Sequence, residues 1–156
     1  MPEVRPVTKD NWRELSKLKV RDDQTHFVAS NVQSIAESQF GYDDPDDGHW
    51  DMHPFGIYDD DGAPVGFLMY GYNFAAPKMQ AFIIRLMVDE NQQGKGFGRF
   101  GMNWMLERFR QEEQIKDVAI SYEPDNEVGR KLYASLGFVE TGEMLGDEVL
   151  AVLRLK

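Results

Sequence analysis

The stretch LMVDENQQGKGFGR, residues 86–99, is the part of the sequence that says most about the fold. An apolar strand runs into a turn that carries Gly94, Gly96 and Gly98, and helical spacing begins directly after the turn. Because glycine has no Cβ, consecutive backbone N–H groups in such a turn can approach a ligand closely. These N–H groups and the helix dipole favour an anion at the helix N-terminus. The stretch therefore predicts a strand, a turn and a helix that together hold a phosphate group.

The spacing of apolar residues on both sides of this stretch predicts an α/β domain with a mixed sheet. The predicted order is β-α-α-β-β-β-α-β-α-β-β, in one domain over residues 1–156. Polar and chain-breaking residues predict a long loop over Gly41–Pro54. In the second helix, Val32, Ile35, Ala36 and Phe40 are predicted to share one apolar face. The predicted strands are 4–7, 55–59, 65–73, 80–89, 117–123, 139–144 and 149–155. Helices are predicted after Thr8 with Trp12, Leu15 and Leu18 on one face, near Ser30, from Phe97 to about Gln114, and from a cap at Asp125 or Asn126 to a stop at Gly137 and Phe138.

The composition is that of an ordinary globular domain, with 42% hydrophobic and 28% charged residues in a chain of 156. No apolar run approaches the roughly 20 residues of a membrane span. The N-terminal residues lack the apolar segment of a secretory signal. The absence of cysteine excludes disulfides, thiolate metal sites and cysteine nucleophiles. We therefore expect a cytoplasmic protein with no membrane partner.

The net charge of −10 argues against a nucleic-acid partner, because binding to a phosphate backbone needs basic patches. A cationic partner fits this charge better. Many acidic proteins, however, are acidic only for solubility, so the charge by itself leaves the partner open.

Three classes of phosphate ligand compete for the glycine turn. A Walker A loop is rejected because Lys95 lies between two glycines and no Ser or Thr follows it. A dinucleotide-binding turn is disfavoured because it should follow the first strand of a parallel unit, whereas several antiparallel-looking strands precede this one. The third pattern is Gln-x-x-Gly-x-Gly, which begins at Gln93. So short a pattern is also compatible with a purely structural helix start.

Two segments together resemble the GNAT superfamily of N-acetyltransferases. Residues 86–99 resemble its acetyl-CoA pyrophosphate loop, and DNEVGRKLYASLGF, residues 125–138, resembles its second signature of Asn, Leu-Tyr and Gly-Phe. The two segments occur in the right order, and the predicted elements agree over essentially the whole chain. The resemblance implies the GNAT fold, with a mixed, mostly antiparallel sheet flanked by about four helices. It also implies acetyl-CoA as co-substrate.

The resemblance assigns the cofactor contacts to two segments. The strand before the glycine turn should splay from its neighbour, so that the backbone of Met87 and Val88 holds the pantetheine arm and polarises the thioester carbonyl as an oxyanion hole does. Without the resemblance, these two apolar side chains would be interpreted as ordinary core residues. The backbone of the loop should hold the CoA pyrophosphate, through Gln93, Gly94, Lys95, Gly96, Phe97, Gly98 and Arg99.

Two further residues match functional positions of the superfamily. Asn126 matches the asparagine that contacts the CoA arm, and it can also cap a helix. Tyr133 matches the tyrosine near the thioester sulfur, a candidate general acid for the departing thiolate. A tyrosine on an amphipathic helix is otherwise most often a core residue, and the Leu132–Tyr133 context favours the catalytic role.

The acceptor amine must lose a proton before it attacks. With a pKa near 10.4, only about one amine molecule in 2,500 is neutral at pH 7, so a base is useful but not obligatory. Glu123, at the end of a predicted strand, is the first candidate for this base. Without cysteine, direct transfer in a ternary complex is favoured over an acyl-enzyme, and holding both substrates together supplies much of the rate.

The whole pattern most resembles the diamine (spermine/spermidine) acetyltransferase branch of the superfamily. The resemblance rests on LMVDENQQGKGFG, SYEPDN and GFVETGE, with Gln24 and Phe27 also similar. It implies a small cationic amine as substrate. Aspartates that could border the acceptor side, or simply solvate loops, are Asp22, Asp23, Asp43, Asp44, Asp46 and Asp47.

Other functions stay open at this point. The acceptor could instead be an aminoglycoside, an amino acid or a protein amine, since acceptor choice varies within one fold. The chain could also be a non-catalytic CoA-binding regulator. Relatives are often dimers, so a homodimer is compatible with the resemblance, although no exposed apolar stripe requires one.

No metal site is predicted. The segment DDPDDG, residues 43–48, suggests a calcium loop, but Pro45 would fill a ligand position and Pro54 stands where the closing Glu belongs. His49 and His53 flank Asp51 at i, i+4 spacing, yet they lie in a predicted loop without a convincing third ligand.

Overall fold

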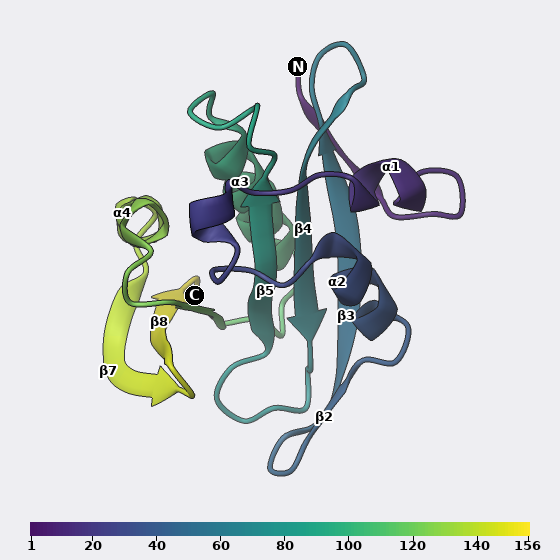
Figure 1. Cartoon of the computed structure of the whole chain (residues 1–156). Helices are drawn as coiled ribbons and strands as arrows, with labels where there is room; N and C mark the ends of the chain where they lie inside the picture. Colours follow the sequence, from purple (N-terminus) through teal and green to yellow (C-terminus); the bar gives the residue numbers. More distant parts are fainter.

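The computed structural model describes residues 1–156 and consists of one mixed β-sheet with helices on both faces (Figure 1). The strand order along the sheet is β1-β3-β4-β5-β6-β8-β7, and β2 pairs with β3 beside this path. All neighbours are antiparallel except β5 and β6. The strands are β1 (Glu3–Pro6), β2 (Tyr42–Asp44), β3 (Gly48–Tyr58), β4 (Pro64–Tyr72), β5 (Ala81–Val88), β6 (Asp117–Tyr122), β7 (Val139–Leu145) and β8 (Glu148–Arg154).

The helices follow the predicted order and lie on both faces of the sheet (Figure 1). They are α1 (Trp12–Ser16), α2 (Asn31–Ser38), α3 (Phe97–Arg110) and α4 (Glu127–Ser135), with one 3-10 turn η1 (Asp22–Gln24) between α1 and α2. None of them is long and apolar enough to span a membrane. The predicted α/β class and the mixed, mostly antiparallel sheet are confirmed.

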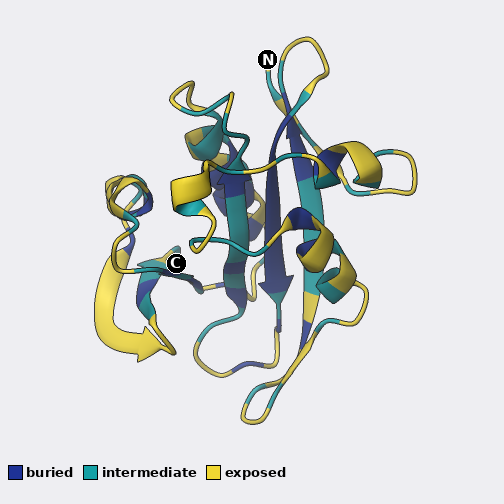
Figure 2. Ribbon diagram, in the orientation of Figure 1, coloured by how far each residue is buried: buried dark blue, intermediate teal, exposed yellow.

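Two apolar cores hold the helices against the sheet. The larger core joins α3, α4 and one sheet face, and its fully buried members include Met102, Met105 and Phe109 of α3. The smaller core contains Phe67, Met69 and Met87, and residues of the N-terminal segments pack against it. Figure 2 shows the central strands buried between these layers, whereas β7 at the end of the sheet is exposed along its length.

The sheet opens in its middle, between β5 and β6. Their parallel pairing covers only Ala81–Val118, Phe82–Ala119 and Ile83–Ile120. The β4–β5 register shifts directly after Ile83, so that Ile84 has no partner opposite it. Such a bulge bends its strand and ends regular pairing. Beyond Ile83, one edge of β5 is therefore free of strand neighbours.

Glycines set the ends of the two helices beside this opening. Gly96 is the N-cap of α3 and has φ = +89°, a left-handed conformation that a residue with Cβ adopts at a cost. Gly137 follows α4 with φ = +102°, and the N–H of Phe138 donates to the carbonyl of Tyr133 at 3.1 Å. This confirms the predicted stop of the last helix at Gly137 and Phe138.

The predicted loop over Gly41–Pro54 is wrong, because this segment forms the β2–β3 hairpin. The side chain of Asp44 accepts the backbone N–H groups of Asp46 and Asp47 at 2.8 and 2.9 Å, which closes a tight turn. Antiparallel pairing of β3 with β4 then continues the strand through His53 and Pro54. The chain-breaking residues thus make one turn instead of a long loop, and the fold has one strand more than predicted.

The first two helices are shorter than predicted and end at Ser16 and Ser38. The predicted apolar face of α2 is only partly correct: Ile35 packs against the smaller core, but Val32 is 53% exposed and Phe40, beyond the helix, is 81% exposed. The buried face instead carries Asn31 and Ser34, whose polar side chains bond to backbone carbonyls. Polar residues with such partners can be buried at little cost, so the apolar pattern misplaced this face.

Candidate active site

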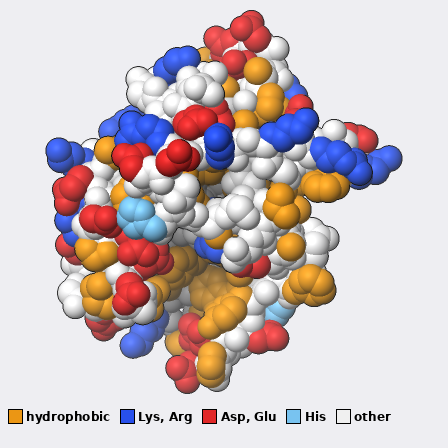
Figure 3. All heavy atoms as spheres, viewed as in Figure 1, with side chains coloured by type: hydrophobic (Ala, Val, Ile, Leu, Met, Phe, Trp, Pro, Cys, Tyr) orange, Lys and Arg blue, Asp and Glu red, His pale blue; other side chains and the backbone are white.

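A cleft of about 610 Å³ occupies the opening between β5 and β6. Figure 3 shows this hollow with apolar side chains inside it and charged side chains around its mouth. Its walls come from the segment after α1, from β5 and the glycine turn, from α4, and from β6 with the start of β8. Segments far apart in the sequence therefore meet around one cavity.

The glycine turn forms one end of the cleft and presents unpartnered donors. The backbone N–H groups from Gly96 to Arg99 make no hydrogen bond within the protein, as expected for the first turn of a helix. A Cβ built on Gly94 or Gly96 would meet no atom within 4 Å. The turn therefore offers open space and free donors, which suit a phosphate group.

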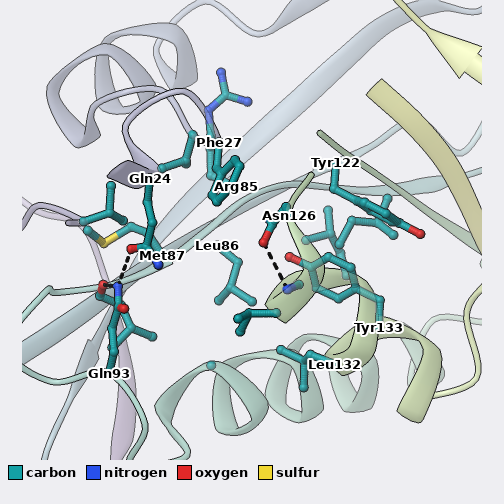
Figure 4. A pocket seen from close by; sticks show the side chains of 18 of the residues that line it. Gln24, Phe27, Arg85, Leu86, Met87, Gln93, Tyr122, Asn126, Leu132 and Tyr133 are labelled. Atoms are coloured by element: carbon teal, nitrogen blue, oxygen red, sulfur yellow. Dashed lines mark hydrogen bonds between the residues drawn. The ribbon is translucent and has the colours of Figure 1, made fainter. Parts of the chain in front are cut away.

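Gln93, the first residue of the turn's motif, links the turn to its surroundings (Figure 4). Its side-chain amide donates to the side-chain oxygen of Gln24 at 2.8 Å and to the backbone carbonyl of Val88 at 3.1 Å. Through these two bonds the end of β5, the glycine turn and η1 hold one another in place.

Met87 and Val88 lie at the free end of β5. They pair with β4 on one side, through Phe67 and Gly66, and have no strand on the other side. The Met87 side chain is 5% exposed and packs with Phe67 and Met69 in the smaller core. Its side chain thus has a structural role, while the free strand edge leaves backbone groups for an extended ligand.

Tyr133 lies on the α4 wall of the cleft and faces Tyr122 of β6, with ring centroids 5.3 Å apart (Figure 4). It is 7% exposed, and burial raises the pKa of its hydroxyl to about 12, with the negative charge of Glu148 as a smaller cause. No hydrogen bond within the protein holds this hydroxyl. Tyr133 is therefore a protonated donor that is free to serve a ligand.

The same wall is stiffened by hydrogen bonds. The Tyr122 hydroxyl and the Nε of Arg130 both donate to Glu140 at 2.8 Å. Burial, and then the bond to Glu140, raise the pKa of Tyr122. The side chain of Asn126 accepts the N–H of Gly129 at 3.1 Å, so it caps α4 at the edge of the cleft. Its predicted capping role is confirmed.

Two of the ionisable side chains that line the cleft already have a carboxylate partner. Arg85 of β5 contacts Glu37 of α2, with 3.2 Å between Nη2 and Oε2. His26 contacts Asp125, with 2.9 Å between Nε2 and Oδ2, and this bond lowers the pKa of the Asp125 carboxyl. The His26–Asp125 contact joins the segment after η1 to the β6–α4 turn across the mouth of the cleft.

Glu148, the first residue of β8, lines the cleft and was missed from the sequence. Its Oε1 accepts the Ser121 hydroxyl at 2.9 Å. It is the only carboxylate among the lining residues. No local signal marks it, because only the pairing of β8 with β6 brings Glu148 beside Ser121.

Most of the predicted site residues surround the cleft, and three do not line it. Lys95 bonds to Gln92 and Arg99 bonds to Ser135, and neither lines the cavity. Glu123 lies directly after β6, and it also is not among the lining residues. None of the six aspartates suggested for the acceptor side lines it either. The lining residues that were predicted are Met87, Val88, Gln93, Gly94, Gly96, Phe97, Gly98, Asn126 and Tyr133.

Comparison with protein families decides the class of this site. The model of the acetyltransferase (GNAT) family matches residues 12–138, which include β5, the glycine turn and α4. The chain belongs to the GNAT family. It is an acyl-CoA-dependent N-acetyltransferase. Residues of the two segments that resemble the family's signatures surround the opening between β5 and β6.

The relatives are named for different acceptors, some of them polyamines and one a ribosomal protein. The chain is 26% identical over 145 residues to the spermine/spermidine N(1)-acetyltransferase of Bacillus subtilis, covering 90% of each chain. The spermidine N-acetyltransferase of Vibrio cholerae, solved with CoA and spermine, has a TM-score of 0.74 at 16% identity, covering 98% of this chain and 95% of that chain. The ribosomal-protein-S18-alanine N-acetyltransferase of Escherichia coli has a TM-score of 0.68 at 14% identity, covering 100% and 95%. The shared fold therefore does not select the acceptor.

Proposed function

We propose that this GNAT enzyme transfers the acetyl group of acetyl-CoA to a primary amine of a polyamine or a similar small cationic amine, by direct attack in a ternary complex. The observation that carries the proposal is the cleft itself, in which the free edge of β5, the unpartnered donors of the glycine turn and the Tyr133 hydroxyl face one cavity. The polyamine acetyltransferases among the relatives support the acceptor class.

The residues of the cleft fit acetyl-CoA, which supplies an activated acetyl thioester. The N–H groups at the start of α3 suit its pyrophosphate, with Gln93 to Arg99 as the loop that holds it. The backbone of Met87 and Val88 suits the amide-rich arm, as an added strand, and suits the thioester carbonyl as an oxyanion donor. Asn126 can contact the arm while it caps α4.

Tyr133 has the properties needed to assist the leaving group. Because its pKa is raised to about 12, the hydroxyl stays protonated at neutral pH. A thiol with an ordinary pKa near 8.5 is a stronger acid than this hydroxyl, so complete proton transfer from Tyr133 to a thiolate is uphill. Tyr133 therefore stabilises the developing thiolate as a hydrogen-bond donor and passes on a proton as the amine nitrogen releases it.

The amine reaches its reactive form by losing a proton, and Glu123 is the residue that the sequence suggests for accepting it. Since Glu123 does not line the cleft, this role requires water between its carboxylate and the amine. Once the neutral amine is held beside the thioester, a C–N bond forms and the C–S bond breaks. No acyl-enzyme is needed, because the two substrates meet in the same cavity.

A panel of amines tests the proposed function. The purified chain is incubated with acetyl-CoA and either spermidine, spermine, a short diamine, an aminoglycoside, an amino acid or a peptide with a free N-terminus, and thiol release is measured. We expect turnover with the polyamines. If only a non-polyamine turns over, the acceptor class is wrong. If CoA binds and no amine turns over, the chain is a regulator with a retained cofactor site.

A further inference from the structure

Glu148 is the one charged side chain of the cleft that lacks a partner of opposite charge. Arg85 contacts Glu37, and His26 contacts Asp125. No Lys, Arg or His nitrogen lies within 4.0 Å of the Glu148 carboxylate, which accepts only the Ser121 hydroxyl, through Oε1. Its second oxygen, Oε2, makes no hydrogen bond within the protein. Glu148 is half-buried, so this free oxygen can accept a charge-assisted hydrogen bond from a cation that enters the cleft.

We propose that Glu148 binds the ammonium group of the acceptor amine and thereby selects a cationic acceptor. This inference rests on the proposed function and deepens it by naming the residue that recognises the substrate. The free oxygen of Glu148 accepts a charge-assisted hydrogen bond from the ammonium, while Ser121 fixes the direction of the carboxylate through the other oxygen. The aspartates of the β2–β3 hairpin do not line the cleft and have no part in this recognition.

The position of Glu148 relates it to the amine that reacts. Glu148 begins β8, Ser121 and Tyr122 lie on the neighbouring β6, and the Tyr122 ring lies beside Tyr133. The negative charge of Glu148 also contributes to the raised pKa of Tyr133, so the two side chains interact across the cleft. A cation held by Glu148 thus lies on the Tyr133 side of the cavity, where the thioester sulfur is expected.

The chemical step conserves atoms and charge. The bound ammonium gives one proton to solvent through water, and the neutral amine nitrogen then attacks the thioester carbon. As the C–S bond breaks, the second nitrogen proton moves to the sulfur by way of the Tyr133 hydroxyl. The proton released to water can pass to Glu123, the base that the sequence suggests, so Glu148 is not needed as the base. Its part is to bind and orient the acceptor.

The substitution Glu148→Gln tests this role, because the amide keeps an oxygen for Ser121 and removes the charge. Spermidine is titrated calorimetrically into the CoA-saturated protein, and the KM for spermidine is measured separately. We expect both the Kd and the KM for spermidine to rise by about 10- to 100-fold, as for a lost hydrogen bond between charged groups. The affinity for CoA stays unchanged. Asp147→Asn, the same loss of charge on the adjacent exposed residue, leaves all these values unchanged.

Each other outcome has a definite meaning. Spermidine affinity unchanged in Glu148→Gln overturns the inference, as does an equal loss in Asp147→Asn, which would indicate a general charge effect. A loss confined to Glu123→Gln would place acceptor recognition at that residue instead. If Glu148→Gln does not fold, Glu148→Asp keeps the charge on a shorter arm and should show an intermediate loss, and wild-type affinity there contradicts the assignment. Absence of turnover with every amine refutes the proposed function alone, because the calorimetric titration still reports on Glu148.

Discussion

At the scale of single residues, the chemistry depends on how Tyr133 and Glu148 are held. Tyr133 is buried against Tyr122 and keeps its hydroxyl free of partners within the protein. Glu148 is oriented by Ser121 through one oxygen only. Both side chains therefore offer an unused hydrogen-bonding group to the cleft. Each group lies on the wall of the cleft, so a ligand that fills the cleft can use it.

The substitution Tyr133→Phe should lower turnover by about 100-fold, the lower part of the range for a positioned proton donor. The affinity for acetyl-CoA should stay nearly unchanged, because the hydroxyl acts on the sulfur as charge develops there. Steady-state kinetics and calorimetry measure the two quantities. The matched control is Tyr58→Phe, which removes another hydroxyl whose pKa is raised to about 12, bonded to Glu14 far from the cleft. Equal turnover in both variants would rule out a role for Tyr133.

At the scale of elements, the end of β5 and the start of α3 form the cofactor site as one unit. The bulge at Ile84 frees the strand edge, and the left-handed Gly96 turns the chain so that the first N–H groups of α3 face the cleft. The bonds of Gln93 to Val88 and Gln24 fix the turn between them. The strand thus suits an extended arm and the helix suits a phosphate, and the turn sets the distance between the two.

The substitution Gly96→Val should weaken CoA binding by about tenfold or more. A left-handed conformation costs a residue with Cβ about 1–2 kcal/mol, so the turn either stays strained or moves its N–H groups, and the side chain fills the open space beside them. Calorimetric titration with CoA measures the change. Gly142→Val on β7 is the control, since Gly142 has φ = +85°, a Cβ there would meet no atom within 4 Å, and the residue lies outside the cleft. Gly142→Val should lower the stability of the protein but leave its affinity for CoA unchanged. Wild-type CoA affinity in Gly96→Val would refute the assignment of the glycine turn as the cofactor site.

At the scale of the whole molecule, the sheet consists of two parts joined by a short parallel contact. Strands β1 to β5 form one part and β6 to β8 form the other, and only three residue pairs connect β5 with β6. The larger core runs across this joint, because α3 and α4 both pack into it. The cleft can therefore stay open between the strands while the helices hold the two parts together.

The overall stability should fall as pH decreases from 7 to 5, in part because of His53. Burial beside Tyr70 and Tyr72, and then the charge of Arg108, lower the pKa of His53, while Asp51 acts in the opposite direction. The unfolded chain, with a pKa near 6.5, then binds the proton more readily than the folded chain. The stability that comes from keeping His53 neutral is fully present above pH 6.5 and is lost as the pH falls through its lowered pKa.

Urea unfolding at pH 7 and pH 5 measures this effect. His53→Gln should show a smaller fall in the free energy of unfolding than the wild type. His49 provides a control of opposite sign, because hydrogen bonding to Asp43 raises its pKa, so that its contribution is present below pH 6.5 and lost as pH rises. His49→Gln should therefore show a larger fall between pH 7 and pH 5. The same fall in all three proteins would contradict both assignments.

Local features of the chain were predictable because a few consecutive residues determine them. The strand, glycine turn and helix at residues 86–99 depend on backbone conformations that only glycine adopts readily, and the cap at Asn126 and the stop at Gly137 are equally local. The family was recognisable for the same reason, because its two signatures are also short runs of consecutive residues. The errors at the β2–β3 hairpin and at α2 arose where pairing with β4, or hydrogen bonds to distant backbone, outweighed the local pattern.

The sequence by itself therefore determined the element order except for β2, the cofactor turn and the family, since each of these depends on short runs of consecutive residues. Only the tertiary structure decided which side chains face the acceptor. It brought Glu148 beside Ser121 through the pairing of β6 with β8, and it joined His26 to Asp125 across the cleft mouth. It also placed the acidic hairpin away from the cavity. The physical reason is that long-range strand pairing, and not the spacing of residues along the chain, sets which side chains share a cavity.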